Sequence, residues 1–171
     1  MNIFYLDSNP KLAAQYHCDK HQKMILESAQ LLSTAHRETD SPWADQVYKS
    51  THKQHPSALW ARSSQEHYSW LYELFRELAE EFFKRRNRFH ASWTKLSPIL
   101  RNMPQGVPSK GFEPPPQCMP DEYKHEDAVE AYRAYYMGDK AAIAEWNWGR
   151  SAPDWFEKVQ EKAWHWPQTM V

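Results

Sequence analysis

A carboxylate, an ammonium group and an imidazole stand close together in a stretch of sequence that is otherwise largely apolar. Glu27 follows Lys23 by four residues and His21 by six, within the segment from Asn9 to His36. Burying a charged group without a partner costs free energy, so a mostly buried helix has few structural reasons to keep these groups. The arrangement is suited to proton transfer, or to stabilising a positive transition state such as a sugar oxocarbenium ion. We therefore predict that Glu27, His21 and Lys23 are catalytic. The alternative is an ordinary surface ion pair, which stabilises little.

The same segment contains a pair of histidines that could chelate a metal ion. His17 and His21 are four residues apart, which places them on one face of a helix. On a helix, Cys18 and Asp19 point away from that face, so a third ligand would have to come from elsewhere. We predict no metal site and no cofactor, and expect both histidines to be buried, hydrogen-bonded groups.

Three other segments combine basic and aromatic side chains, as nucleic-acid contacts do. They read HKQHPSALWARSS (52–64), KRRNRFHASWTK (84–95) and AYRAYYMGDK (131–140). Cationic side chains could bind phosphate, and aromatic rings could hold a displaced base. The predicted nucleic-acid-binding residues are His55, Trp60, Arg62, Arg86, His90, Tyr132, Arg133, Tyr136 and Lys140. The alternative is that the aromatic rings belong to the core and the basic groups lie at solvated helix ends.

The elements that must position these residues are helical. Asn9 can cap a helix whose first residue is Pro10, and no glycine or proline follows before His36. Apolar residues lie around most of its circumference, with a narrow polar stripe of Lys23, Glu27, Gln30 and Thr34, so one long buried helix is predicted over 9–36. A second helix is predicted from Ser63, with Glu66 completing a capping box, to about Lys84.

The rest of the chain alternates connections and shorter helices. The stretch 37–57 and the proline-rich stretch at about 103–121 are predicted to be loops, and 3–6 a short strand or extended arm. Shorter helices are predicted over 93–101, 126–137 with Gly138 as C-cap, 139–148 and 153–166. The fold class is all-α, a compact single domain over 1–171 built on two long central helices.

Composition limits the classes of function. The chain has 171 residues and a formal net charge of -1, so a nucleic-acid partner would have to meet a local patch. No apolar run approaches the roughly 20 residues that span a bilayer, so no membrane association is expected. Two cysteines without a framework spacing and no signal peptide favour a reducing cytoplasm.

Much of the chain resembles a family of small proteins from tailed bacteriophages. The resemblance runs roughly from Asn2 to Trp148 and is carried by YHCDKHQKMILESAQLLSTAH, HPSALWARSSQEHYSWLYEL and MPDEYKHEDAVEAYRAYYMGDK. It implies a viral protein in the host cytoplasm, but the family offers no activity to transfer.

A fainter similarity is to the phage pyrimidine-dimer DNA glycosylase, an all-α endonuclease that repairs ultraviolet lesions. The matching features are His21 and Glu27 on the first helix, KRRNRF after the second, and YRAYYMGDK near the end. That enzyme attacks with the amino group of a small residue, whereas Asn2 occupies the corresponding place here. The resemblance implies an enzyme that acts on a DNA base or nucleotide. The alternative function is a non-catalytic viral protein that binds a host defence or replication factor through exposed tryptophans.

Overall fold

The structure is a computed structural model that describes residues 1–156. Within these residues the fold is all-α and contains no strand. The α-helices are α1 (Pro10–Tyr16), α2 (Met24–Glu38), α3 (Pro56–Ala61), α4 (Gln65–Arg86), α5 (Ala91–Leu100) and α6 (Ala128–Met137). Short 3-10 helices are η1 (Asp19–Lys23), η2 (Ala44–Gln46), η3 (Asp121–Tyr123) and η4 (Ala141–Ile143).

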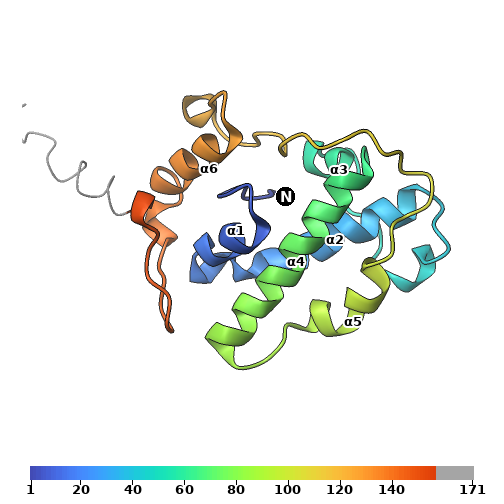
Figure 1. Cartoon of the computed structure of the whole chain (residues 1–171), viewed down its shortest axis with the longest axis horizontal. Helices are drawn as coiled ribbons and strands as arrows, with labels where there is room; N and C mark the ends of the chain where they lie inside the picture. The colour runs from blue at the N-terminus through green and yellow to red at the C-terminus, as the bar shows by residue number, and fades with distance from the viewer. Residues whose placement is uncertain (157–171) are drawn as a thin grey trace, which may run out of the picture.

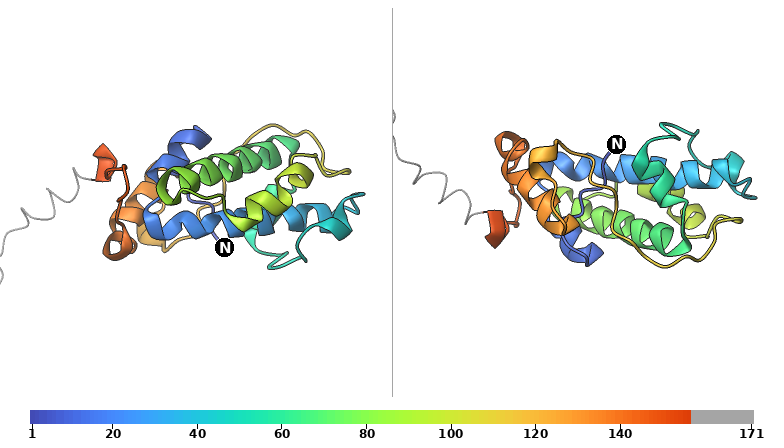
Figure 2. Two further views of the ribbon diagram at one scale, coloured as in Figure 1. Left: turned by 90° about the horizontal axis from the view of Figure 1, so that it is seen from below. Right: turned by 90° about the horizontal axis from the view of Figure 1, so that it is seen from above.

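The two longest helices, α2 and α4, form the centre of the molecule. Both views in Figure 2 show them side by side. Helices α1, α3 and α5 pack against this pair, and the chain from α5 to α6 runs along its side as a long irregular strap (Figure 1). Apolar side chains from α2 and α4 make the middle of one core, among them Ile25, Leu32, Leu71 and Phe75. The predicted all-α fold on two central helices is confirmed.

The prediction of a single helix over 9–36 is wrong. The chain leaves the helical conformation at His17 and Cys18, and then continues as η1 and α2. Because the break exposes backbone carbonyl groups inside the protein, they need donors from elsewhere. Arg85 of α4 donates to the carbonyl oxygens of Gln15 and His17 at 3.1 and 2.9 Å, and the Trp146 indole donates to that of Tyr16 at 3.1 Å.

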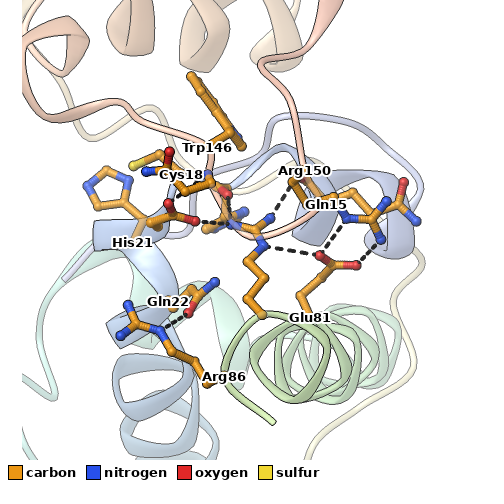
Figure 3. A network of polar contacts seen from close by, with 12 residues as sticks. Gln15, Cys18, His21, Gln22, Glu81, Arg86, Trp146 and Arg150 are labelled. Carbon is orange, nitrogen blue, oxygen red and sulfur yellow. Dashed lines mark hydrogen bonds and ion pairs between the residues drawn. The ribbon is translucent and has the colours of Figure 1, made fainter.

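A buried ion-pair network holds the break in place. The fully buried guanidinium of Arg85 lies 3.0 Å from Asp19 Oδ1 and 3.3 Å from Glu81 Oε2. Arg150 makes two further bonds to the Glu81 carboxylate, at 2.9 and 2.5 Å. Figure 3 shows Glu81 of α4 facing Arg150. The network therefore joins α1, η1, α4 and the chain after α6.

Local signals predict some helix ends and miss others. The Asn9 side chain accepts bonds from Lys11 N and Leu12 N, as a cap before Pro10 should. The capping box at Ser63 is wrong, because Ser64 is the N-cap of α4 and its hydroxyl donates to Glu66 and to the Gly111 carbonyl instead. Gly138 ends α6 as predicted.

Other expected elements also differ from the structure. The stretch 37–57 contains η2 and the start of α3, and 139–148 contains only η4 instead of a helix. Residues 3–6 form an extended arm that is buried in the core, not a strand. Thr34, assigned to the polar stripe, is buried, whereas Leu12 and Leu26 are exposed. Most of the helix predicted over 153–166 lies outside the described residues.

Candidate functional site

The three residues predicted to be catalytic line one small polar cavity. His21 and Lys23 come from η1, Glu27 from the first turn of α2, and Lys140 from the turn after α6. The N-terminal arm closes the cavity with Met1, Asn2 and Phe4, and its volume is about 140 Å³. Segments more than a hundred residues apart in sequence therefore meet at this point.

Glu27 is half-buried and has no hydrogen bond or ion pair within residues 1–156. Its charge affects the pKa of His55, which lies at the start of α3. Burial lowers the pKa of His55, as do the amino group of Met1 and His52, while the Glu27 carboxylate opposes that shift. Lys23 and Lys140 contribute two ammonium groups to the cavity, against the one carboxylate of Glu27. The excess positive charge favours an anionic ligand.

His21 is a neutral member of the site. Its Nδ1 lies 2.6 Å from the Tyr136 hydroxyl, and its ring stacks on Phe4 with the centroids 4.3 Å apart. Burial lowers the pKa of His21 to about 3, helped by the nearby charges of His17, Lys140 and Lys23. The imidazole is therefore uncharged at neutral pH, and the lysines supply the positive charge.

One of the lining residues, Asn2, also carries an unsatisfied polar atom. The side-chain oxygen Oδ1 of Asn2 is buried and has no hydrogen-bond partner among the described residues. Buried acceptors without a partner are rare in folded proteins, so this atom is an exception within the N-terminal arm. Sequence reasoning missed Met1, Asn2 and Phe4, although the apolar arm after Asn2 was the signal that this end is anchored in the fold.

The aromatic residues predicted to hold a base lie in the core. Trp60 is 8% exposed, stacks on His67 and donates from Nε1 to the Glu113 carbonyl at 2.9 Å. Tyr132 and Tyr136 are fully buried, and the Tyr132 hydroxyl donates to the Pro116 carbonyl at 2.5 Å. None of the three offers an open ring face, so we remove them from the candidate nucleic-acid contacts. Tyr136 belongs to the site in another way, because its hydroxyl is the hydrogen-bond partner of His21.

The guanidinium groups of two arginines that were predicted to bind phosphate donate hydrogen bonds to backbone carbonyl groups instead. Arg62 donates to the carbonyl oxygens of Lys53 at 2.8 Å and Ala58 at 3.2 Å. Arg133 donates to the Leu6 carbonyl at 2.9 Å and pairs with Asp7 at 3.2 Å. Neither lines the cavity around Glu27. Arg133 instead fixes the N-terminal arm to α6, and so supports the cavity wall.

The remaining predicted contacts lie at helix ends. His55 and His90 are the N-caps of α3 and α5, and each accepts a backbone N–H through Nδ1 at 3.1 Å. Arg86 is exposed at the end of α4, where its guanidinium lies 4.0 Å from the centre of the Trp148 ring. Of the nine predicted nucleic-acid contacts, the structure places only Lys140 in the same cavity as Glu27.

The two histidines of the first segment each bond through Nδ1 to another group of the protein. His17 Nδ1 bonds to the Ala13 carbonyl at 2.6 Å, whereas His21 bonds to Tyr136. No group of three or more potential ligands is assembled in the part of the chain that the structure describes. Within residues 1–156 every helix is also too short or too polar to cross a lipid bilayer.

Comparisons with known protein families, with curated proteins and with solved structures find no match. The geometry of the site is therefore the basis for a functional proposal.

Proposed function

We propose that the cavity around Glu27 is the active site of an enzyme that acts on a DNA base or nucleotide, with an architecture like that of a DNA glycosylase. The observation that carries the proposal is the convergence of Lys23, Lys140 and an unpaired Glu27 carboxylate on one polar cavity. The similarity to the phage repair enzyme, in which Glu27 and His21 match residues of its first helix, supports the same carboxylate. We propose a tailed-phage origin on separate grounds, the resemblance of the chain to small proteins of tailed bacteriophages.

The size of the cavity limits which part of a nucleotide it can hold. About 140 Å³ is room for a few water molecules, each of which takes about 30 Å³ in the liquid. Whole small-molecule sites usually measure about 300 to 1,000 Å³. A phosphate or a sugar ring therefore enters the cavity, while the base lies over its mouth. This fits the burial of the aromatic residues once predicted to hold a base.

The charged lining residues and His21 each have a role in this proposal. Lys23 and Lys140 bind phosphate, and Glu27 accepts a proton from water as the water attacks the sugar carbon and the base leaves with the bonding electrons. The carboxylate also stabilises the positive charge that develops on the sugar. Neutral His21, held by Tyr136, fixes one wall and leaves its other ring nitrogen for hydrogen bonding.

Replacing Glu27 with glutamine tests the proposed catalytic role. General acid–base catalysis contributes about 100- to 10,000-fold, so Glu27→Gln is expected to lower turnover by at least about 100-fold. The assay uses labelled duplexes that carry a pyrimidine dimer, an abasic site or no lesion, and follows base release and strand cleavage. Thermal unfolding is expected to change little, because Glu27 makes no hydrogen bond or ion pair in the described structure.

The matched control is Glu130→Gln, an exposed residue in the first turn of α6. It removes the same charge from a residue that does not line the cavity, and it is expected to keep full activity. Turnover that is unchanged in Glu27→Gln would remove Glu27 from the mechanism.

The alternative, a non-catalytic protein that binds a host factor, predicts a contiguous patch of exposed tryptophans and no cleft near Glu27. Among the seven tryptophans in residues 1–156, only Trp148 is exposed, at 53%, and the Arg86 guanidinium covers its ring. A cavity is present at Glu27. These observations favour the enzymatic proposal over the interaction protein.

A further inference from the structure

A second and larger cavity lies where the start of α1, the first turns of α4 and the loop after α5 meet. Its volume is about 410 Å³, within the usual range for small-molecule sites. Most of its wall is apolar. The lining residues are Pro10, Gln65, Glu66, Ser69, Trp70, Glu73, Met103 and Phe112.

Two aromatic rings in the wall are held in position by their neighbours. The Trp70 indole donates to the Ser8 carbonyl at 2.9 Å, and the centres of the Trp70 and Phe112 rings are 6.2 Å apart. Phe112 also packs against Trp60 and Tyr5, although it is 41% exposed. Ring faces that are fixed before a ligand arrives bind cations at a lower entropic cost.

Among the described residues that form the wall, only two are charged, and both are carboxylates. Glu66 accepts bonds from the hydroxyl groups of Ser109 and Ser64 and from Gly111 N, at 2.6 Å for Ser64 and 3.2 Å for Gly111. These neutral donors lower the pKa of Glu66 to about 2 without cancelling its charge. Glu73 pairs with Arg76, which is not part of the wall.

We propose that this cavity binds a small methylated ammonium compound. The apolar wall accommodates the methyl groups, the faces of Trp70 and Phe112 attract the positive charge, and Glu66, whose hydrogen-bond donors are neutral, supplies negative charge at the rim. A neutral apolar ligand would gain no electrostatic attraction from this negative charge, and a phosphate would be repelled by it. The site is therefore opposite in polarity to the cavity around Glu27, and it stands independently of the proposed enzymatic activity.

Choline is the probe, and its uncharged carbon isostere dimethylbutanol is the comparison. The two have similar shape, so a difference in affinity reports the charge. Titration of the full chain, followed by tryptophan fluorescence and by backbone amide NMR, is expected to show choline binding with shifts at Ser69, Trp70 and Phe112, and much weaker binding of the alcohol. Equal binding of both compounds, or binding of neither, would overturn the proposal.

Two variants separate the contributions to binding. Phe112→Leu keeps an apolar side chain but removes the ring, and is expected to weaken choline binding about 3- to 30-fold, the range of a cation–π contact. Glu73→Gln leaves the Arg76 guanidinium without this partner, and so makes the rim more positive, while the Glu66 hydrogen bonds stay intact; it is also expected to weaken binding. Glu80→Gln, on α4 but outside the wall, is the control and is expected to bind like the wild type. Affinity that is the same in Phe112→Leu and wild type would contradict the proposed role of the ring.

Discussion

Replacing Arg85 with methionine is expected to lower the free energy of unfolding by about 3–5 kcal/mol, the usual cost of removing one partner of a buried ion pair. The Arg85 side chain is fully buried, and its loss leaves Asp19 and Glu81 with one partner fewer. It also leaves the carbonyl groups of Gln15 and His17 without their donor. Since natural domains are stable by only about 5–15 kcal/mol, this is a large share of the total.

Urea unfolding followed by circular dichroism measures this loss. Arg76→Met is the matched control on the same helix, because Arg76 pairs with Glu73 and Glu77 at the surface. Such exposed pairs contribute about 0–1 kcal/mol, so the control is expected to unfold near the wild-type midpoint. A loss below about 1 kcal/mol for Arg85→Met would mean that the network does not hold the break between α1 and η1.

The second large effect is acid unfolding driven by three buried histidines. Burial lowers the pKa of His17 to about 4, of His21 to about 3 and of His36 to about 4. In the unfolded chain these groups titrate near the ordinary value of about 6.5. Below that pH the unfolded chain therefore binds protons that the folded chain does not, and stability falls as the pH falls.

The size and the pH range of this loss follow from the shifts. Each histidine contributes up to about 1.4 kcal/mol per pH unit, or about 4 kcal/mol per unit for all three, between pH 6.5 and the folded values. Cooperative unfolding is therefore expected between about pH 6 and pH 4.

The Glu81 carboxylate affects the stability of the protein at a lower pH than the histidines do. Burial raises its pKa, but the bonds from Arg150 and the charge of Arg85 outweigh this and lower it overall. Its stabilising contribution is therefore lost only as the pH falls through that lowered value, after the histidines have acted.

Urea midpoints measured at a series of pH values test the histidine prediction, and NMR titration of the imidazole protons assigns it. His52→Gln is the control, because His52 is exposed, and it is expected to leave the pH dependence unchanged. Constant stability between pH 6.5 and 4.5, or imidazoles that titrate near the ordinary value of about 6.5, would contradict the assignment.

The sequence predicts those parts of the fold that depend on local patterns. Apolar periodicity marks α4 and α6, and Asn9 before Pro10 marks the start of α1. The break at His17 and Cys18 has no local signal, because it depends on donors that arrive from Arg85 and Trp146. A helical pattern shows which residues prefer a helix. It does not show which distant side chain will hydrogen-bond to the backbone groups that are exposed where the helix breaks.

The candidate site also contains some residues that local sequence predicts and others that it does not. His21, Lys23 and Glu27 are close in sequence, so their proximity could be predicted, even though the helix assumed for them is interrupted. Trp60 and Tyr132 carry the chemistry of base stacking, but the same rings pack well in a core, and composition does not distinguish the two uses. The closing of the cavity by Asn2 depends on how the N-terminal arm packs, which the sequence does not encode locally.

The central claim, that the cavity around Glu27 binds a phosphate-bearing ligand, is tested most directly by titrating the full chain with thymidine monophosphate and following backbone amide NMR signals. We expect shifts that concentrate at Asn2, Lys23, Glu27 and Lys140, and that weaken markedly in Lys140→Met but not in Lys110→Met, an exposed lysine outside the cavity. Shifts that avoid these residues, or that are the same in Lys140→Met and wild type, would contradict the claim.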